Sequence, residues 1–201
     1  MLTTPAIESN DYPHPDEHSH SKGSLLSDRD LLDLIEQKKL GIEPFNPVCI
    51  KSTSIDLQLG PTLVRYTSPQ TIRLDNPDAK PEAEEIDITD SVYTLHPGEF
   101  ILGMTKESVF IPNGYQGFIE TKGNIARAGL QAHCGDGHID PGFFGHITLE
   151  ISNMHRGSDV SIQIIPGIYI CQLFIFRLTS ECKSVYKGKY SGYFKPSTYL
   201  P

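Results

Sequence analysis

Short runs of alternating apolar and polar residues, each ended by glycine or proline, constrain the fold of this chain most. In the clearest run, residues 145–152, Ile147, Leu149 and Ile151 alternate with polar residues. A period of two places neighbouring side chains on opposite faces of a β-strand. Further short β-rich runs cover residues 55–59, 62–66, 100–104, 108–111, 115–120, 160–164 and 168–178. The pattern predicts a mainly β protein, a sandwich or jelly roll.

Two segments of this pattern carry more specific expectations. Residues 168–178 are apolar on both faces, which predicts a central or interface strand. Residues 67–90 are acidic and contain proline, which is typical of a surface excursion.

One helix is expected near the start, over residues 27–40. Ser27 and Asp30 form a capping-box pattern ahead of four apolar residues at helical spacing. Two lysines suit the last helical turn, and Gly41 suits the position after the helix end.

The 201 residues favour a single folded domain with two polar ends. We expect a disordered extension over residues 1–23, a β domain over 24–182 and a flexible tail over 183–201. The tail carries four lysines and no acidic residue, although the whole chain has a net charge of −8. This balance disfavours a nucleic-acid polymer and fits a small anionic ligand, although a solubilising tail is the simpler alternative.

Other features of the sequence bear on location. No apolar run is long enough to span a membrane, and the first residues do not resemble a secretory signal. Four cysteines without a CxxC spacing fit a reducing compartment rather than a disulfide framework. We therefore expect a cytoplasmic protein with no membrane partner.

Residues 121–153 are the densest stretch of polar and charged residues that could carry chemistry. Asp140 precedes a Pro-Gly turn, and Glu150 lies on the polar face of the clearest strand. By spacing alone, the aspartate is as well explained as a turn former and the glutamate as a solvated strand residue.

The same stretch resembles the signature region of the dCTP deaminase family, in the dUTPase-like superfamily. The matching segments are ARAGL at residues 126–130, His133, IDPGF at 139–143 and GHITLE at 145–150. The family's start, first long strand and tail are resembled by LSDRD at 26–30, IEPF at 42–45, TSIDLQLG at 53–60, GKY at 188–190 and Pro196-Ser197.

The resemblance implies a distorted jelly-roll, dUTPase-like, with a short N-terminal helix. It also implies a homotrimer with active sites at subunit boundaries, each closed by the C-terminal tail. The implied enzyme is a hydrolase acting on the C–N bond of a cyclic amidine. It converts dCTP to dUTP and ammonia, and related members also hydrolyse dUTP to dUMP. Mg²⁺ accompanies the triphosphate and zinc is not used, which fits the absence of the H-x-E and P-C-x-x-C zinc pattern.

By resemblance, Glu150 is the proton shuttle, and Asp140 lies near the deoxyribose 3′-hydroxyl. The residues expected to bind substrate are Lys122, Asn124, Arg127, Asp136, His138, Phe143, Tyr186, Lys189, Tyr190 and Tyr193. Ordinary core packing also explains Phe143, and a solvated tail position also explains Lys189.

Two departures from the family pattern fall on ligand-facing positions. Gly123-Asn124 stands where the family has two serines, the first of which helps to position the attacking water. In the tail, Ser191-Gly192-Tyr193 stands where the family usually has a glutamine. These departures keep two alternatives open: a nucleotide pyrophosphatase without deamination, and a catalytically weak, nucleotide-binding regulatory trimer.

Overall fold

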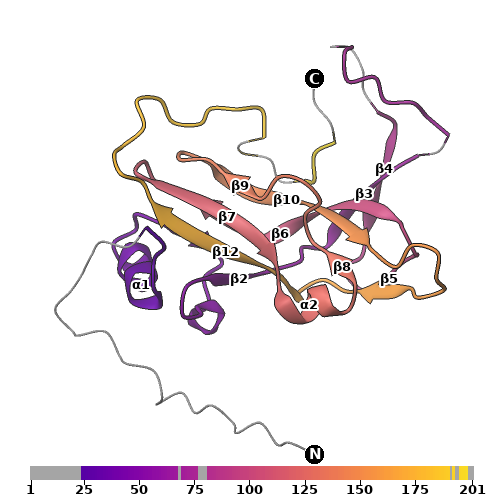
Figure 1. Cartoon of the computed structure of the whole chain (residues 1–201), viewed down its shortest axis with the longest axis horizontal. Helices are drawn as coiled ribbons and strands as arrows, with labels where there is room; N and C mark the ends of the chain where they lie inside the picture. The colour runs from indigo at the N-terminus through magenta and orange to yellow at the C-terminus, as the bar shows by residue number, and fades with distance from the viewer. Residues whose placement is uncertain (1–23, 68, 77–80, 191, 193–194, 199–201) are drawn as a thin grey trace, which may run out of the picture.

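Two antiparallel sheets face each other in the computed structural model, which describes residues 24–67, 69–76, 81–190, 192 and 195–198 (Figure 1). The larger sheet has the order β4 (Ala83–Asp87), β3 (Thr62–Tyr66), β6 (Phe100–Phe110), β10 (Phe144–Asn153), β8 (Leu130–Gln131), and β1 (Gly41–Glu43) also pairs with β6. The second sheet has the order β2 (Ile55–Gln58), β12 (Tyr169–Arg177), β7 (Tyr115–Thr121), β9 (His138–Ile139). A small third sheet pairs β5 (Tyr93–Leu95) with β11 (Ile162–Ile164). The predicted extension, residues 1–23, lies outside the described residues.

The apolar face of β10 forms the centre of the core, as its alternation predicts. Ile147, Leu149 and Ile151 are buried and belong to one cluster with Leu173 and Ile119 of the second sheet. Burial of such side chains is the main favourable term in folding, at about 2 kcal/mol each. The opposite face of β10 is left for polar residues and, as described below, forms the floor of a pocket.

The predicted strand that is apolar on both faces, residues 168–178, corresponds to β12, which lies between β2 and β7 in the second sheet. The prediction of a central strand is therefore confirmed. Among the described residues, no helix is both long and apolar enough to cross a membrane.

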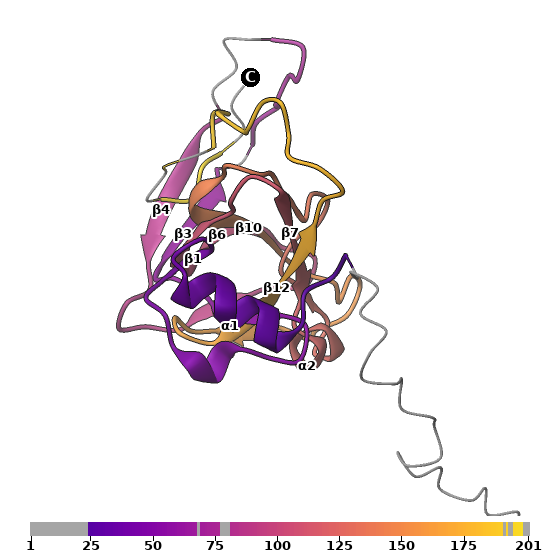
Figure 2. The same ribbon diagram turned by 90° about the vertical axis from the view of Figure 1, so that its left-hand side faces the viewer.

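The predicted helix begins where expected but ends early. In α1 (Asp28–Glu36) both capping-box hydrogen bonds are present, from the Asp30 backbone to the Ser27 hydroxyl and from the Ser27 backbone to the Asp30 carboxylate. The helix ends four residues before the predicted position, with Lys38 at a φ of 55° in place of the expected glycine. The Lys39 N–H donates to the Leu34 carbonyl, which closes a Schellman motif. The early end lets Gly41 start β1 beside β6 (Figure 2), so its prediction as a helix cap is wrong.

Two strand predictions also need correction. Part of the expected surface excursion, Ala83–Asp87, forms edge strand β4, paired with β3 along its whole length. Its charged residues suit a sheet edge, because they discourage pairing with other chains. The same charges obscure the strand alternation in the sequence.

The runs 100–104 and 108–111 form one strand, β6, with a register shift between them. There the Thr105 hydroxyl replaces part of the ladder, accepting from Ile147 N–H at 2.9 Å and donating to the Glu107 carbonyl.

Candidate active site

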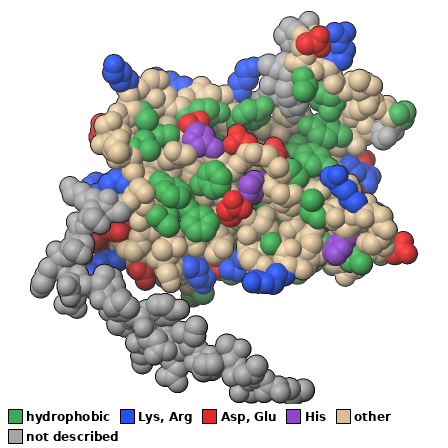
Figure 3. Space-filling model, viewed as in Figure 1, with side chains coloured by type: hydrophobic (Ala, Val, Ile, Leu, Met, Phe, Trp, Pro, Cys, Tyr) green, Lys and Arg blue, Asp and Glu red, His purple; other side chains and the backbone are tan. Residues whose placement is uncertain are grey.

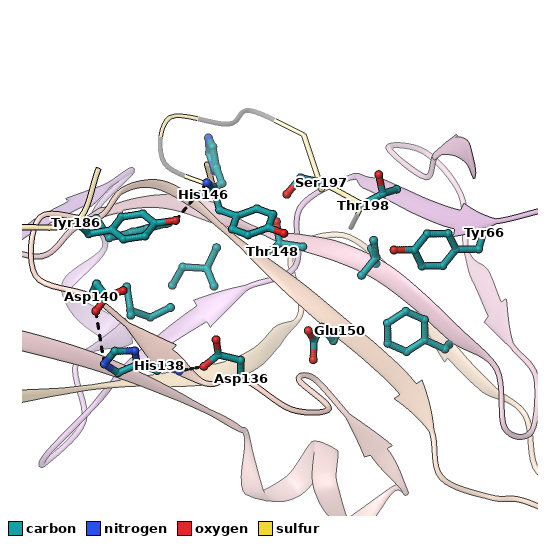
Figure 4. A pocket seen from close by; sticks show the side chains of 16 residues that line it. Tyr66, Asp136, His138, Asp140, His146, Thr148, Glu150, Tyr186, Ser197 and Thr198 are labelled. Carbon is teal, nitrogen blue, oxygen red and sulfur yellow. Dashed lines mark hydrogen bonds and ion pairs between the residues drawn. The ribbon is translucent and has the colours of Figure 1, made fainter. Parts of the chain in front are cut away.

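A pocket of about 550 Å³ opens on the polar face of β10. Acidic and histidine side chains gather near the middle of this side of the molecule (Figure 3). The lining side chains come from β3, β6, β9, β10, the loops on either side of β9 and the C-terminal segment (Figure 4). They include seven of the twelve predicted site residues: Asp136, His138, Asp140, Phe143, Glu150, Tyr186 and Tyr190.

Glu150 is oriented by backbone donors. Its Oε2 accepts N–H groups of Cys134 and Gly135 at 3.1 and 3.0 Å, and the Cys134 thiol donates to the Glu150 carbonyl. Hydrogen bonds from N–H groups to a carboxylate are stronger than neutral ones. The carboxylate is therefore fixed through one oxygen, which leaves the other for a ligand in the pocket.

Asp140 opens a tight turn that its sequence explains. Pro141 sets φ at the second position, Gly142 has a φ of 91° at the third, and the Phe143 N–H returns to the Asp140 carbonyl at 3.1 Å. A side chain at Gly142 would also place its Cβ 2.8 Å from Cβ of Val185. The glycine is thus required both by the turn and by the close passage of the C-terminal segment.

Phe143 both packs in the core and faces the pocket. It is only 7% exposed, and its ring centroid lies 6.4 Å from that of Tyr186. The two interpretations of this residue from the sequence are therefore compatible.

The C-terminal segment crosses the pocket mouth. The Tyr186 N–H donates to the Pro141 carbonyl at 2.7 Å, and the Gly192 N–H donates to the Phe144 carbonyl at 2.7 Å. Tyr186, Tyr190, Ser197 and Thr198 line the pocket, whereas Lys189 does not. Tyr193 lies outside the described residues.

Three predicted substrate-binding residues lie away from this pocket, on and before α2 (Gly123–Arg127). The Lys122 ammonium contacts Asp56, a side chain only 2% exposed, at 2.6 Å. Asn124 and Arg127 are exposed, and Arg127 donates to the Gly123 carbonyl at 3.2 Å. A single chain therefore does not bring these residues together with Glu150.

The pocket is acidic. Asp136, Asp140 and Glu150 line it, and among the described residues no lysine or arginine does. A polyanion in this pocket therefore needs cationic groups from elsewhere, because like charges repel strongly in a partly desolvated site. No cluster of three or more His, Cys, Asp or Glu side chains that could hold a metal ion occurs in the described part of the chain.

Sequence reasoning missed several lining residues. His146 and Thr148 share the polar face of β10 with Glu150, so the alternation of that strand could have identified them. Tyr66 and Phe100 stack at 6.3 Å between ring centroids, on β3 and β6. Since only the strand pairing brings these two together, no local pattern could have identified them.

Comparisons with known proteins agree with this architecture. A model of the dCTP deaminase-like family matches residues 25–178. The chain is 36% identical over 169 residues to a dCTP deaminase, dUMP-forming, of Pseudarthrobacter chlorophenolicus, covering 83% of this chain and 87% of that one. It is 39% identical over 169 residues to a protein of the same name from Mycobacterium avium, covering 81% and 85%.

Among solved structures, the fold is similar to a 2′-deoxycytidine 5′-triphosphate deaminase from Agrobacterium tumefaciens, with a TM-score of 0.60 and 20% identity. The match covers 77% of this chain and 48% of that chain, so this chain spans about half of the solved one. The chain belongs to the dCTP deaminase-like family. The predictions of this family and of a mainly β, dUTPase-like jelly roll with a short N-terminal helix are confirmed.

Proposed function

We propose that the protein is a dCTP deaminase that forms dUTP and ammonia, and that it continues to dUMP and pyrophosphate. One observation carries the proposal most directly: Glu150 and Asp140 of the family signature line one pocket, with the Glu150 carboxylate held by two N–H donors. Relatives at 36–39% identity, over more than four fifths of the chain, are named for this pair of reactions.

In the proposed deamination Glu150 moves protons. The glutamate takes a proton from water as the water oxygen adds to C4 of cytosine, and delivers it to N3. The glutamate then carries the proton of the new C4 hydroxyl to the exocyclic nitrogen, the C4–N bond breaks as C4=O forms, and ammonia leaves. The balance is dCTP and water giving dUTP and ammonia. Anchoring of Oε2 by Cys134 and Gly135 restricts the carboxylate to one orientation for both transfers.

Asp140 and Phe143 define the sugar end of the proposed site. The carboxylate accepts the deoxyribose 3′-hydroxyl, and the Phe143 ring packs on the sugar. In the second reaction, Asp140 orients the water that attacks phosphorus, giving dUMP and pyrophosphate from dUTP. The fixed turn at Pro141 and Gly142 suits these roles, since it holds both side chains on one rigid support.

The acidity of the pocket supports a homotrimer with shared sites. A triphosphate brings several negative charges to a pocket that already holds three carboxylates. Arg127 and Asn124, exposed on α2, supply phosphate donors to the pocket of a neighbouring copy. Exposed Phe110 and Phe144, paired across β6 and β10, suit burial in such an interface.

The remaining parts follow from the same function. The substrate arrives as the Mg²⁺ complex of dCTP or dUTP, in which phosphate oxygens supply most metal ligands. Residues 183–201 close over the nucleotide, residues 24–182 form the catalytic domain, and residues 1–23 are a polar extension. Four free cysteines suit the reducing cytoplasm.

Gly123 favours a second candidate, a nucleotide-binding relative with little or no deamination. The position carries no hydroxyl at the start of α2, where the family serine helps to hold water. A lost preorganised donor costs about 10²-fold or more in rate.

Product analysis separates the candidates. The full chain is incubated with Mg-dCTP and separately with Mg-dUTP, and ammonia and pyrophosphate are measured. Ammonia and pyrophosphate from dCTP are expected. Pyrophosphate from dUTP without ammonia from dCTP would support a pyrophosphatase, and binding without either product would support a regulatory protein.

A further inference from the structure

His138 and Asp140 face each other at the edge of the pocket. The His138 Nε2 lies 3.7 Å from the Asp140 Oδ1, and the two side chains are 44% and 43% exposed (Figure 4). In the part of the chain that the structure describes, this imidazole is the one side chain that forms an ion pair or hydrogen bond with the Asp140 carboxylate. The separation suits an ion pair and exceeds a hydrogen bond, so the contact strengthens when the imidazole is protonated.

The backbone around both residues is fixed. In β9, His138 is paired with Phe118 and Ile139 with Gly117 of β7. Because Ile139 is buried, the alternation of the strand directs His138 outward to the pocket. The Asp136 carboxylate accepts the His138 N–H at 3.0 Å, which holds the start of the strand.

Because the backbone is fixed, the side-chain torsions of Asp140 are its main remaining conformational freedom. An exposed aspartate samples several rotamers, and a partner that favours one of them reduces the entropy lost when a ligand binds. A half-exposed ion pair contributes little to stability, so the contact is better explained by orientation than by folding.

We propose that His138 is a positioning residue that holds the Asp140 carboxylate toward the deoxyribose 3′-hydroxyl. The preference of the pocket for a nucleotide with that hydroxyl then depends on His138. This inference rests on the proposed function, because it uses a deoxynucleotide as the ligand.

A paired binding experiment tests the proposal. Affinities for dCTP and for 2′,3′-dideoxycytidine triphosphate, both with Mg²⁺, are measured in a Glu150→Gln background that prevents turnover. His138→Phe is expected to weaken dCTP binding about fivefold and to leave binding of the dideoxy analogue unchanged. His138→Gln, which retains a donor, should recover most of the loss.

His96→Phe is the matched control, because His96 is exposed and does not line the pocket. It should leave both affinities unchanged, and thermal unfolding should show that all variants are folded. Equal losses for both nucleotides, or full retention of the dCTP preference in folded His138→Phe, would overturn the inference while leaving the proposed function intact. Failure of the parent background to bind either nucleotide would overturn both.

Discussion

The three carboxylates of the pocket differ in what holds them. Asp136 accepts an N–H two residues along its own loop, and Asp140 faces an imidazole. Glu150 accepts two N–H groups from residues fifteen and sixteen positions earlier in the chain. Glu150 alone among them is oriented by a long-range contact. A proton shuttle needs such fixed geometry more than a turn former does.

Gly123 provides a direct test at the same scale. A Cβ there would meet only the Arg127 Nη1, at 3.4 Å, so a serine fits with a small adjustment of a flexible side chain. We expect Gly123→Ser to leave ammonia release from dCTP unchanged or to raise it, because it adds a water-positioning hydroxyl. Steady-state ammonia assays on both proteins measure the effect, with Gly123→Ala as the control that adds the Cβ at this position without the hydroxyl. A large loss of activity in a folded Gly123→Ser variant would contradict the assignment of this position.

Glu107 provides a test of stability against pH. The side chain is only 6% exposed, and burial raises its pKa, although its Oε2 accepts the Gln58 N–H at 2.9 Å. A raised pKa means that the folded state binds the proton more tightly than the unfolded state. Stability from this group is therefore present at low pH and is lost as pH rises through the window from the unfolded to the folded pKa.

Glu107→Gln keeps the shape and the acceptor but removes the buried charge. The variant should melt above the parent at pH 7.5, and the difference should shrink as pH falls to about 5. Thermal unfolding across this range measures it, with exposed Glu181→Gln as the control that changes little. A variant less stable than the parent at pH 7.5 would show that the charge itself is needed.

At the scale of elements, local chemistry was predictable and long-range pairing was not. The start of α1 and the two faces of β10 follow from short patterns, and both are confirmed. The end of α1 and the continuity of β6 depend on partners distant in sequence, β1 and β10. The charged strand β4 is held by its pairing with β3, which its own sequence does not reveal.

The candidate site follows the same division. The family signature predicted Glu150, Asp140 and Phe143, which the structure places in one pocket. The aromatic pair Tyr66 and Phe100 could not be predicted, because it arises from the meeting of β3 and β6. The separation of α2 from the pocket could not be read from sequence either, since it depends on how the two sheets stack.

The role of the C-terminal segment can be tested by truncation. Deletion of residues 186–201 should weaken triphosphate binding far more than monophosphate binding, because closure excludes water around the charged groups. Calorimetry with dUTP and dUMP on the parent and the truncated chain measures both. Equal losses for the two nucleotides would count against a segment that closes over phosphates.

At the scale of the whole molecule, charge distribution argues for assembly. The chain carries a net charge of −8, and three of its carboxylates line the pocket in which a polyanion is proposed to bind. The exposed Arg127 lies on a separate element, α2. Assembly of several copies can place the arginine of one beside the pocket of the next.

We therefore expect a homotrimer, with a mass about three times the 22.3 kDa of the chain. Light scattering at micromolar concentration measures the mass. Mixing an inactive Glu150→Gln chain with an inactive Arg127→Ala chain should restore partial activity, because some mixed boundaries hold both native residues. A stable monomer, or no recovery in confirmed mixed trimers, would leave the acidic pocket without its phosphate donors.

The most direct test of the whole account is ammonia release from dCTP by the parent and by Glu150→Gln, with dCTP affinity measured on both. We expect ammonia release by the parent, its loss in Glu150→Gln and nearly unchanged dCTP binding. The glutamine has the same shape as the glutamate, and its amide oxygen can accept the same two hydrogen bonds from Cys134 and Gly135, which both reach one oxygen of Glu150. Normal ammonia release by Glu150→Gln would contradict it.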